Sequence, residues 1–506
     1  MSKLTRSLLF LALLFSVVLN GNSQVKNSVI NGKVTSSDGT PLAGAKVIAT
    51  FIPSGSLFAA LTDGTGTYRL PNLEVGGPYS VKVSLDGYKP YIQGNIYLTL
   101  GQTLGIDVLL KGDVIKQPKS GKKHCLVVLS MDGFRWDYPV IYHTPNLDRL
   151  ARDGCKAVSL KPSYPSKTFP NHYAIATGLY PDHNGIVQNS FYDPKLDRVF
   201  RMGDRQAVED SVFWEGEAIW ETAEQQGVKT AAYFWVGTES NERYRPEMRK
   251  IYESGFPYIQ QIDTVFKWLS MPSDQRPELI MFYFDEPDKT SHTFGPVSPE
   301  TGKVVRNLDD LVGKLMDGLK KIGKKSSLDI DLIILSDHGM GLIPEGQQIF
   351  LEDVADLKKI KRINGGSPVL TLEPEPAFSE ELYGKLKSTP HIKVWKRTEL
   401  PVRYHYGTNK RIPELIVEAD SAYGLEIRRK AQGTGQKYSL GMHGYDPDNK
   451  DMHGIFYAAG PSFKKGFVQP TFENVNIYEL LAKVLQVKPA KTDGDLKVVK
   501  GMLKGN

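Results

Sequence analysis

Seven side chains that could bind metal or act as a nucleophile are spread over separate segments of this 506-residue chain. Carboxylate and imidazole groups together suit zinc better than magnesium or calcium, which prefer shells made of oxygen alone. The set is large enough to supply nitrogen and oxygen ligands to two ions, and it therefore predicts a two-metal site for phosphoryl transfer. The seven residues are Asp132, Thr168, Asp288, His292, Asp337, His338 and His443.

The first two of these residues lie where an element is expected to begin or end. Asp132 follows the apolar run CLVVLS at 125–130, so it is predicted at the carboxyl end of a parallel strand. Thr168 lies in SKTFPNH, 166–172, which is typical of a turn that opens a helix. A hydroxyl near a helix amino terminus is favoured to meet an anion, so Thr168 is the candidate nucleophile. His443 lies far downstream in a loop flanked by glycines.

The other four residues come in two pairs, each after a probable buried strand. Asp288 and His292 are four residues apart, so one helical turn would bring both side chains to one point. Asp337 and His338 are adjacent, and adjacent residues of a strand point to opposite faces. The two could share a metal only if the backbone turns there, which the following Gly339 allows.

Longer motifs around these residues resemble the nucleotide pyrophosphatase/phosphodiesterases of the alkaline phosphatase superfamily. The resemblance implies an α/β fold with a mostly parallel central sheet flanked by helices, and a cap insertion at about 341–441. The resemblance runs from about Lys123 to about Lys497. It rests on MDGFRWDY from Met131, KTFPNHYAIATGLYPDHNGIVQNSFYDP from Lys167, EPDKTSHTFGP from Glu286, SDHGM from Ser336, MHGYDP from Met442 and AAGPSFKKG from Ala458.

The same resemblance implies two Zn²⁺ ions and a role for each ligand. Thr168 would attack phosphorus and form a phosphothreonine ester, and Asn189 would donate to a non-bridging phosphoryl oxygen. The activity implied is hydrolysis of nucleotide phosphodiester and pyrophosphate bonds to nucleoside 5'-monophosphates. One zinc would be held by Asp288, His292 and His443, and the other by Asp132, Asp337, His338 and Thr168.

Aromatic residues indicate the substrate pocket. Phe169 and Tyr252 match the two positions between which the family binds the nucleobase, and such a slot would accept several bases. Trp235 lies in FWVGTE, where related enzymes have FWPG, so Val236 departs from the family pattern. The alternative reading is that Phe169 and Tyr252 are ordinary packed residues.

Other activities are weighed against this one. Two Zn²⁺ balanced by three carboxylates and an alkoxide leave a nearly neutral site, which suits a monoanionic diester. Related phosphomonoesterases have an arginine beside the nucleophile, where this chain has Phe169, and the C/S-x-P-x-R context of sulfatases is missing. A choline- or glycerol-type phosphodiesterase with the same metal site stays open. So does a non-catalytic surface-binding protein, although no ligand is lost.

Some polar residues near the motifs are expected to be structural. His172 and His183 lie within the nucleophile segment but match no ligand position, and His453 precedes an apolar strand. Asp285 competes with Asp288 as a metal ligand, and the spacing to His292 favours the latter.

The amino-terminal part has a different texture. Lys3, Arg6 and the apolar run 8–19 are typical of a secretory signal peptide, so we expect export to the periplasm or the exterior of a bacterium. Short alternating segments with turn signals then predict an all-β sandwich that resembles carboxypeptidase regulatory-like domains. The predicted order is a signal peptide at 1–23, a β-sandwich at 25–111, a linker at 112–122 and a catalytic domain at 123–506.

Composition adds limits. The formal charge of +6 is modest for this length and gives no case for sequence-specific nucleic-acid binding. After residue 19 no segment has about 20 unbroken apolar residues, so no transmembrane segment is expected. Cys125 and Cys155 are expected to be buried and reduced, with a bridge as the alternative. The oligomeric state is left open.

Overall fold

The computed structural model describes residues 28–36, 39–85, 88, 90–110, 123–241, 244–428 and 438–505. The chain divides into two compact units, Met1–Gln117 and Pro118–Asn506. The expected signal peptide at 1–23 and the expected linker at 112–122 lie outside the described residues. Among the residues that are described, no helix combines the length and the apolar character needed to cross a membrane.

In the described part of the first unit, the regular elements are all strands, which confirms the expected all-β fold. Its core includes Val47, Val81 and Tyr79, whose neighbours along each strand face outward, as the two-residue period of a strand requires. One sheet has the order β3-β2-β5-β6; in the other, β4, β7 and β8 pair with β1. The strands are β1 Ser28–Ser36, β2 Lys46–Phe51, β3 Ser56–Leu61, β4 Thr67–Leu73, β5 Gly76–Ser84, β6 Tyr91–Leu98, β7 Thr103–Gly105 and β8 Val108–Leu110.

The second unit is built on an eight-stranded sheet with the order β15-β14-β16-β9-β17-β26-β10-β27. The first five strands of this order are parallel, and β26 runs antiparallel to both of its neighbours. The expected mostly parallel sheet is therefore confirmed. Its strands are β15 Met248–Lys250, β14 Thr230–Tyr233, β16 Leu279–Phe284, β9 Lys123–Met131, β17 Leu328–Leu335, β26 Phe456–Ala459, β10 Cys155–Ala157 and β27 Phe467–Gln469.

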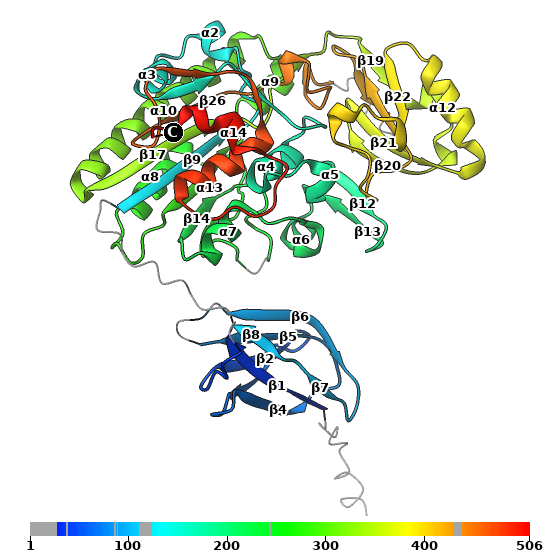
Figure 1. The fold of residues 1–506 in the computed structure, drawn as a ribbon. Helices are drawn as coiled ribbons and strands as arrows, with labels where there is room; N and C mark the ends of the chain where they lie inside the picture. Colours follow the sequence, from blue (N-terminus) through cyan, green and yellow to red (C-terminus); the bar gives the residue numbers. More distant parts are fainter. Residues whose placement is uncertain are drawn as a thin grey trace, which may run out of the picture. The chain divides into compact units, whose positions relative to one another are not determined.

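Helices cover both faces of this sheet (Figure 1). Leu126 and Val128 of β9 point into one core, and Val127 and Leu129 point into the other. Burial on both faces explains why the central strands are apolar without interruption. The first core includes α4 Thr168–Thr177, α7 Ile219–Gln225 and α13 Ile477–Leu485, and the second includes α3 Pro145–Asp153, α8 Tyr258–Leu269 and α10 Pro299–Ser326.

An additional antiparallel sheet, β20-β21-β23-β22, lies within the range expected for the cap insertion. The segment that carries it is closed at its base by β18 and β25, which pair Gly341 with Met442 and Leu342 with Gly441. Its elements are β18 Gly341–Leu342, β19 Gln348–Phe350, α11 Leu351–Val354, β20 Ile360–Gly366, β21 Val369–Pro374, α12 Ser379–Ser388, β22 Ile392–Lys396, β23 Leu415–Ala419, β24 Gly424–Glu426 and β25 Gly441–Met442.

Shorter elements connect these layers. The hairpin β12–β13 precedes α6, and α9 begins at Asp288 directly after β16. These elements are α2 Tyr138–Tyr142, β11 Leu160–Lys161, α5 Pro181–Asn184, β12 Ser190–Asp193, β13 Arg198–Arg201, α6 Arg205–Glu209, α9 Asp288–Phe294, β28 Phe472–Glu473 and α14 Leu496–Val499.

Candidate active site

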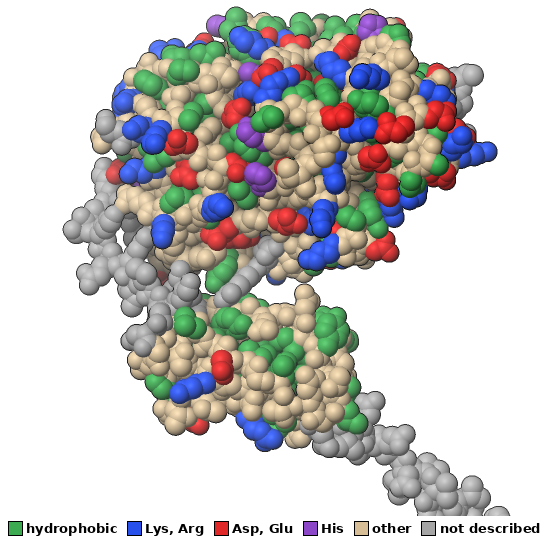
Figure 2. Space-filling view, turned by 45° about the vertical axis from the view of Figure 1, so that its right-hand side comes forward, with side chains coloured by type: hydrophobic (Ala, Val, Ile, Leu, Met, Phe, Trp, Pro, Cys, Tyr) green, Lys and Arg blue, Asp and Glu red, His purple; other side chains and the backbone are tan. Residues whose placement is uncertain are grey.

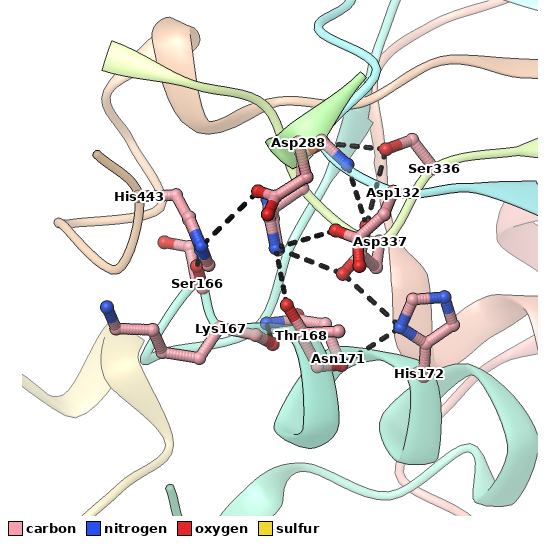
Figure 3. A network of polar contacts seen from close by, with 12 residues as sticks. Asp132, Ser166, Lys167, Thr168, Asn171, His172, Asp288, Ser336, Asp337 and His443 are labelled. Carbon is pink, nitrogen blue, oxygen red and sulfur yellow. Dashed lines mark hydrogen bonds and ion pairs between the residues drawn. The ribbon is translucent and has the colours of Figure 1, made fainter. Parts of the chain in front are cut away.

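The three acidic candidates meet at the carboxyl edge of the sheet. Asp132 follows β9, Asp288 opens α9 after β16, and Asp337 follows β17. The strands β16, β9 and β17 are neighbours in the sheet, so their carboxyl ends deliver the three carboxylates to one place. Figure 3 shows Asp132, Asp288 and Asp337 gathered above Thr168, the first residue of α4. The hydroxyl oxygen of Thr168 lies 3.2 Å from Nε2 of His338.

All three candidate histidines are fixed in the same tautomer by backbone carbonyls. A carbonyl can only accept, so each Nδ1 carries a proton, and in the neutral imidazole Nε2 is the nitrogen that can bind a metal. Metal-binding histidines are commonly oriented in this way by a partner on the second nitrogen. The distances are 2.6 Å from His292 Nδ1 to Gly441 O, 2.9 Å from His338 Nδ1 to Gly339 O and 2.8 Å from His443 Nδ1 to Ser166 O.

The free Nε2 atoms face the carboxylates at distances that suit a shared ion. His292 Nε2 lies 3.5 Å from Asp288 Oδ2, and His443 Nε2 lies 3.5 Å from Asp288 Oδ1. His338 Nε2 lies 3.4 Å from Asp132 Oδ1. Two ligand atoms of a tetrahedral zinc site, each at about 2.0–2.1 Å from the metal, are about 3.3 Å apart. The side chains therefore stand close to the spacing that zinc requires.

Two groups of ligand atoms result, and Asp288 belongs to both. Asp288, His292 and His443 form one, and Asp132, Asp288 and His338 form the other. The family resemblance implies Asp337 and Thr168, in place of Asp288, beside Asp132 and His338 in the second group. The structure places Asp337 Oδ2 3.0 Å from His338 Nε2, while its Oδ1 accepts from the backbone N–H of Gly133 at 3.3 Å.

Each of the three carboxylates has one buried oxygen that accepts no hydrogen bond from the described residues and has only imidazole nitrogen close to it: Asp132 Oδ1, Asp288 Oδ1 and Asp337 Oδ2. Buried carboxylates without such partners are costly unless they are paired or coordinate a metal. Burial, followed by repulsion from Asp337 and Asp288, raises the pKa of Asp132 well above its usual range. The cluster therefore needs positive charge, and this donor set fits divalent zinc.

His172 lies behind this cluster and is not placed as a ligand, because both of its nitrogens have protein partners. Its Nε2 lies 2.8 Å from Ser130 Oγ. Its Nδ1 lies 3.0 Å from the carbonyl of Thr168 and 3.3 Å from Asp337 Oδ2. The expectation of a packed, hydrogen-bonded histidine agrees with these contacts, which also show that His172 supports Asp337.

Tyr283 contacts Asp132, and sequence reasoning did not identify this residue. Its hydroxyl donates to Asp132 Oδ2 at 2.5 Å. Tyr283 belongs to β16, whose sequence LIMFYF is typical of an uninterrupted buried strand, so nothing in the sequence indicated a role for its hydroxyl.

Lys167 was also not identified from the sequence. Its Nζ donates to the carbonyl of Ser367 in the inserted segment, and burial lowers its pKa to about 8.

A cavity of about 540 Å³ opens beside Thr168 and is lined by Phe169, Tyr252 and Phe234. Phe234 has a positive φ of 66°, which is uncommon for a bulky residue and typical of functional sites. Trp235 also lines the cavity, but its side chain is fully buried and packs edge-on against His172. Its indole supports the wall from behind.

Asp285, the alternative to Asp288 as a metal ligand, lies on the wall of this cavity and is bound by other side chains. It accepts from the hydroxyls of Tyr252 at 2.8 Å and Tyr258 at 2.5 Å, and it pairs with Lys289 at 3.1 Å. These contacts hold Tyr252 in place. Asp285 belongs to neither of the two ligand groups.

The remaining predicted structural residues have protein partners. His183 Nδ1 lies 2.7 Å from Asp493 Oδ2, and His453 Nδ1 lies 2.8 Å from Ser159 Oγ. Cys125 and Cys155 are both buried and form no disulfide, as expected.

Comparison with known proteins places this geometry in a family. Residues 126–446 match the model of type I phosphodiesterase/nucleotide pyrophosphatase, and residues 29–111 match that of the carboxypeptidase regulatory-like domain. A venom phosphodiesterase of Naja atra is 36% identical over 390 residues, which are 74% of this chain and 46% of that relative. Human ectonucleotide pyrophosphatase/phosphodiesterase family member 1 is 36% identical over 389 residues, 73% of this chain and 40% of the relative. The chain thus spans less than half the length of either relative.

Solved structures give the same result. Murine ectonucleotide pyrophosphatase/phosphodiesterase 5 is similar with a TM-score of 0.71 and 30% identity, over 75% of this chain and all of that one. An inactive variant of the murine protein in complex with AMP has the same TM-score and identity, over 76% of this chain and all of that one. The alkaline phosphatase-like α/β fold expected from the motifs is confirmed.

Proposed function

Because this chain belongs to the type I phosphodiesterase/nucleotide pyrophosphatase family, we propose that it hydrolyses nucleotide phosphodiester and pyrophosphate bonds and releases nucleoside 5'-monophosphates. The observation that carries the proposal is the set of three carbonyl-bonded imidazoles facing three buried carboxylate oxygens that accept no hydrogen bond, close to Thr168. In this proposal two Zn²⁺ ions are bound, one by Asp288, His292 and His443, and the other by Asp132, Asp337, His338 and Thr168.

The chemistry falls to Thr168 and Asn189. Bound zinc would lower the pKa of the Thr168 hydroxyl and offset the charge of the phosphoryl group and the leaving oxygen. Thr168 Oγ1 then attacks phosphorus in line with the leaving group and becomes the ester oxygen of phosphothreonine, while the bond from phosphorus to the leaving oxygen breaks and the leaving group departs with a proton equivalent to the one that Thr168 lost. Asn189 donates from Nδ2 to a non-bridging oxygen, where negative charge grows. Water then attacks phosphorus, releases the monophosphate and returns the proton to Thr168.

The cavity beside Thr168 supports a nucleobase as the group that is recognised. Phe169 is half-buried and Tyr252 is exposed on the wall, so both can offer ring faces to a base. A choline group would need an aromatic cage or free negative charge. The two acidic wall residues other than the proposed ligands are already paired, Glu239 with Arg205 at 3.0 Å and Asp285 with Lys289 at 3.1 Å. The wall therefore has no unpaired carboxylate for a choline group, and its exposed rings are left to stack on a base.

Export is also part of the proposal. The matched relatives include a venom phosphodiesterase and an ectonucleotide pyrophosphatase/phosphodiesterase, names that indicate a location outside cells. Together with the signal-peptide pattern at 1–23, they support a location in the periplasm or outside the cell.

The proposal is tested by turnover of p-nitrophenyl thymidine monophosphate beside p-nitrophenyl phosphorylcholine, each with chelator and with zinc restored. We expect faster turnover of the nucleotide diester, loss of both activities with chelator, and recovery with zinc. A preference for the choline ester would overturn the base pocket and keep the metal mechanism. Activity that chelator leaves untouched would overturn the metal mechanism.

A further inference from the structure

A second cavity, of about 560 Å³, lies between the hairpin β12–β13 and the inserted sheet β20-β21-β23-β22. We propose that it is an anion site that binds the phosphate group of inorganic phosphate or of a phosphate monoester. It shares no described lining residue with the cavity beside Thr168. The inference therefore goes beyond the proposed function and does not depend on it.

Positive charge is concentrated around this cavity. On the face that Figure 2 shows, Lys and Arg side chains are mixed with Asp and Glu side chains. The cavity departs from that mixture, because five cationic side chains line it against two carboxylates, Glu373 and Glu414. The cations are Arg362, Lys396, Arg397, Lys410 and Arg411.

Two of the five cations are left for a ligand. Arg397 and Lys410 have no carboxylate partner within 4.0 Å among the described residues, and the Arg397 guanidinium donates only to the carbonyl of Ile412, at 3.2 Å. Glu414 is turned to Ser379 Oγ at 2.5 Å. The other three cations are paired: Arg362 with Glu373 at 2.7 Å, Lys396 with Glu380 at 2.5 Å, and Arg411 with Asp193 at 2.7 Å.

A buried amide points to the same kind of ligand. Asn364 in β20 lines the cavity with only 8% of its surface exposed. Its Nδ2 is buried and has no hydrogen-bond partner among the described residues. An amide NH₂ can only donate, so the group that satisfies it must be an acceptor. A phosphate oxygen held by Arg397 and Lys410 is such an acceptor, and it would receive a charge-assisted hydrogen bond.

The wall that carries Lys410 is rigid before any ligand binds. The carboxylate of Asp182 accepts hydrogen bonds from the backbone of residues 407–409, which lead to Lys410. Arg411, the residue after Lys410, is anchored by its own buried guanidinium. A preformed site of this kind loses little conformational entropy on binding. Asp182 Oδ1 accepts from the N–H groups of Gly407, Thr408 and Asn409, each at 2.9 Å, and Arg411 donates to the carbonyls of Gly185 at 2.8 Å and Phe213 at 2.7 Å.

The test is calorimetric titration of the full chain with inorganic phosphate, with and without chelator, at pH 8. Wild type is expected to bind one equivalent that persists in chelator. The double variant Arg397→Gln with Lys410→Gln should weaken that equivalent by at least about 10-fold, as the loss of two charge-assisted bonds requires. Lys361→Gln with Lys387→Gln makes the same change in net charge on the insertion, away from the cavity, and should bind phosphate as wild type does.

A second variant guards against misfolding of the first. Asn364→Asp keeps the shape of the side chain but places a carboxylate where the free amide donor stands, so it should also remove the chelator-resistant equivalent. Thermal unfolding of each variant checks that it is folded. Equal phosphate binding by wild type and the cavity variants, or equal weakening in the Lys361/Lys387 control, would overturn the proposal. AMP is then added as a competitor: displacement of phosphate would assign the site to monoesters, and no displacement would assign it to free phosphate.

Discussion

The side-chain oxygen of Asn189 accepts a hydrogen bond from the backbone N–H of Phe169, at 3.0 Å. This contact commits Oδ1, leaves Nδ2 as the donor and ties Asn189 to the residue that follows Thr168. Asn189→Ala should therefore lower kcat by about 10²–10³-fold with little change in KM, because the donor acts where charge grows in the transition state.

The isosteric change Asn189→Asp sharpens this prediction. The carboxylate can still accept from Phe169, but it has no N–H to offer the phosphoryl oxygen, so kcat should fall at least as far as in the alanine variant. The measurement is kcat and KM on p-nitrophenyl thymidine monophosphate. A kcat within about threefold of wild type in either variant would remove Asn189 from the mechanism.

Thr168 is expected to be the nucleophile. Thr168→Ala should lower turnover of the same substrate by at least about 10³-fold while the protein stays folded, because no other hydroxyl is proposed to attack phosphorus. Thr168→Ser keeps a hydroxyl and should retain measurable turnover. Near-normal turnover by Thr168→Ala would refute the role, and mass spectrometry of acid-quenched wild type should detect the phosphothreonine ester.

Metal content tests the ligand sets directly. Wild type purified without chelator should contain two zinc ions per chain by elemental analysis. His292→Ala and His443→Ala should each contain about one, because each change removes a ligand of the same ion. His183→Ala is the matched control, since His183 pairs with Asp493 away from the site, and it should keep both ions. Less than one zinc per wild-type chain would contradict the assignment.

Strand ends and the spacing of polar residues were enough to predict that these side chains meet at one edge of the sheet. Asp132 and Asp337 come directly after apolar runs, and such runs form the central strands β9 and β17. The pair Asp337 and His338 needed a turn after the strand, and β17 does end before them, at Leu335. Local sequence is informative here because burial on both faces demands apolar residues until the chain leaves the sheet.

The supporting contacts could not be predicted in this way. The carbonyls that fix the tautomers of His292 and His443 belong to Gly441 and Ser166, and a backbone carbonyl leaves no mark in the sequence. The Tyr283 hydroxyl is hidden in an apolar strand. The anion cavity joins residues from β12, β20 and the loop before β23, which only the folded chain brings together.

Base stacking predicts a defect in substrate binding when either ring is removed. Phe169→Ala and Tyr252→Ala should each raise KM for a nucleotide diester by about 10–100-fold, because a stacked base contributes about 1–3 kcal/mol. A diester without a base, bis-p-nitrophenyl phosphate, serves as the control for the metal centre. Tyr252→Phe keeps the ring but loses the bond to Asp285, so its effect should be smaller. An unchanged KM in both alanine variants would mean that the rings only pack.

Glu418 predicts a pH dependence of stability. It lies in β23 with 1% exposure, and burial raises its pKa from 4.5 to about 7. Between these values the folded protein keeps Glu418 neutral while the unfolded chain ionises it, so unfolding releases a proton. The contribution of Glu418 to the free energy of unfolding should therefore fall as pH rises from 4.5 to 7 and then level off.

Glu418→Gln removes this titration. Relative to wild type, the variant should gain up to about 3 kcal/mol in free energy of unfolding between pH 4.5 and pH 8. Denaturant unfolding at both values measures the change, and the exposed Glu345→Gln is the matched control, for which no gain is expected. If the variant and wild type keep a constant difference across this range, Glu418 is ionised in the folded protein. The backbone N–H of Asp446, which donates to Glu418 Oε1 at 3.1 Å, would then stabilise the charged carboxylate enough to offset its burial.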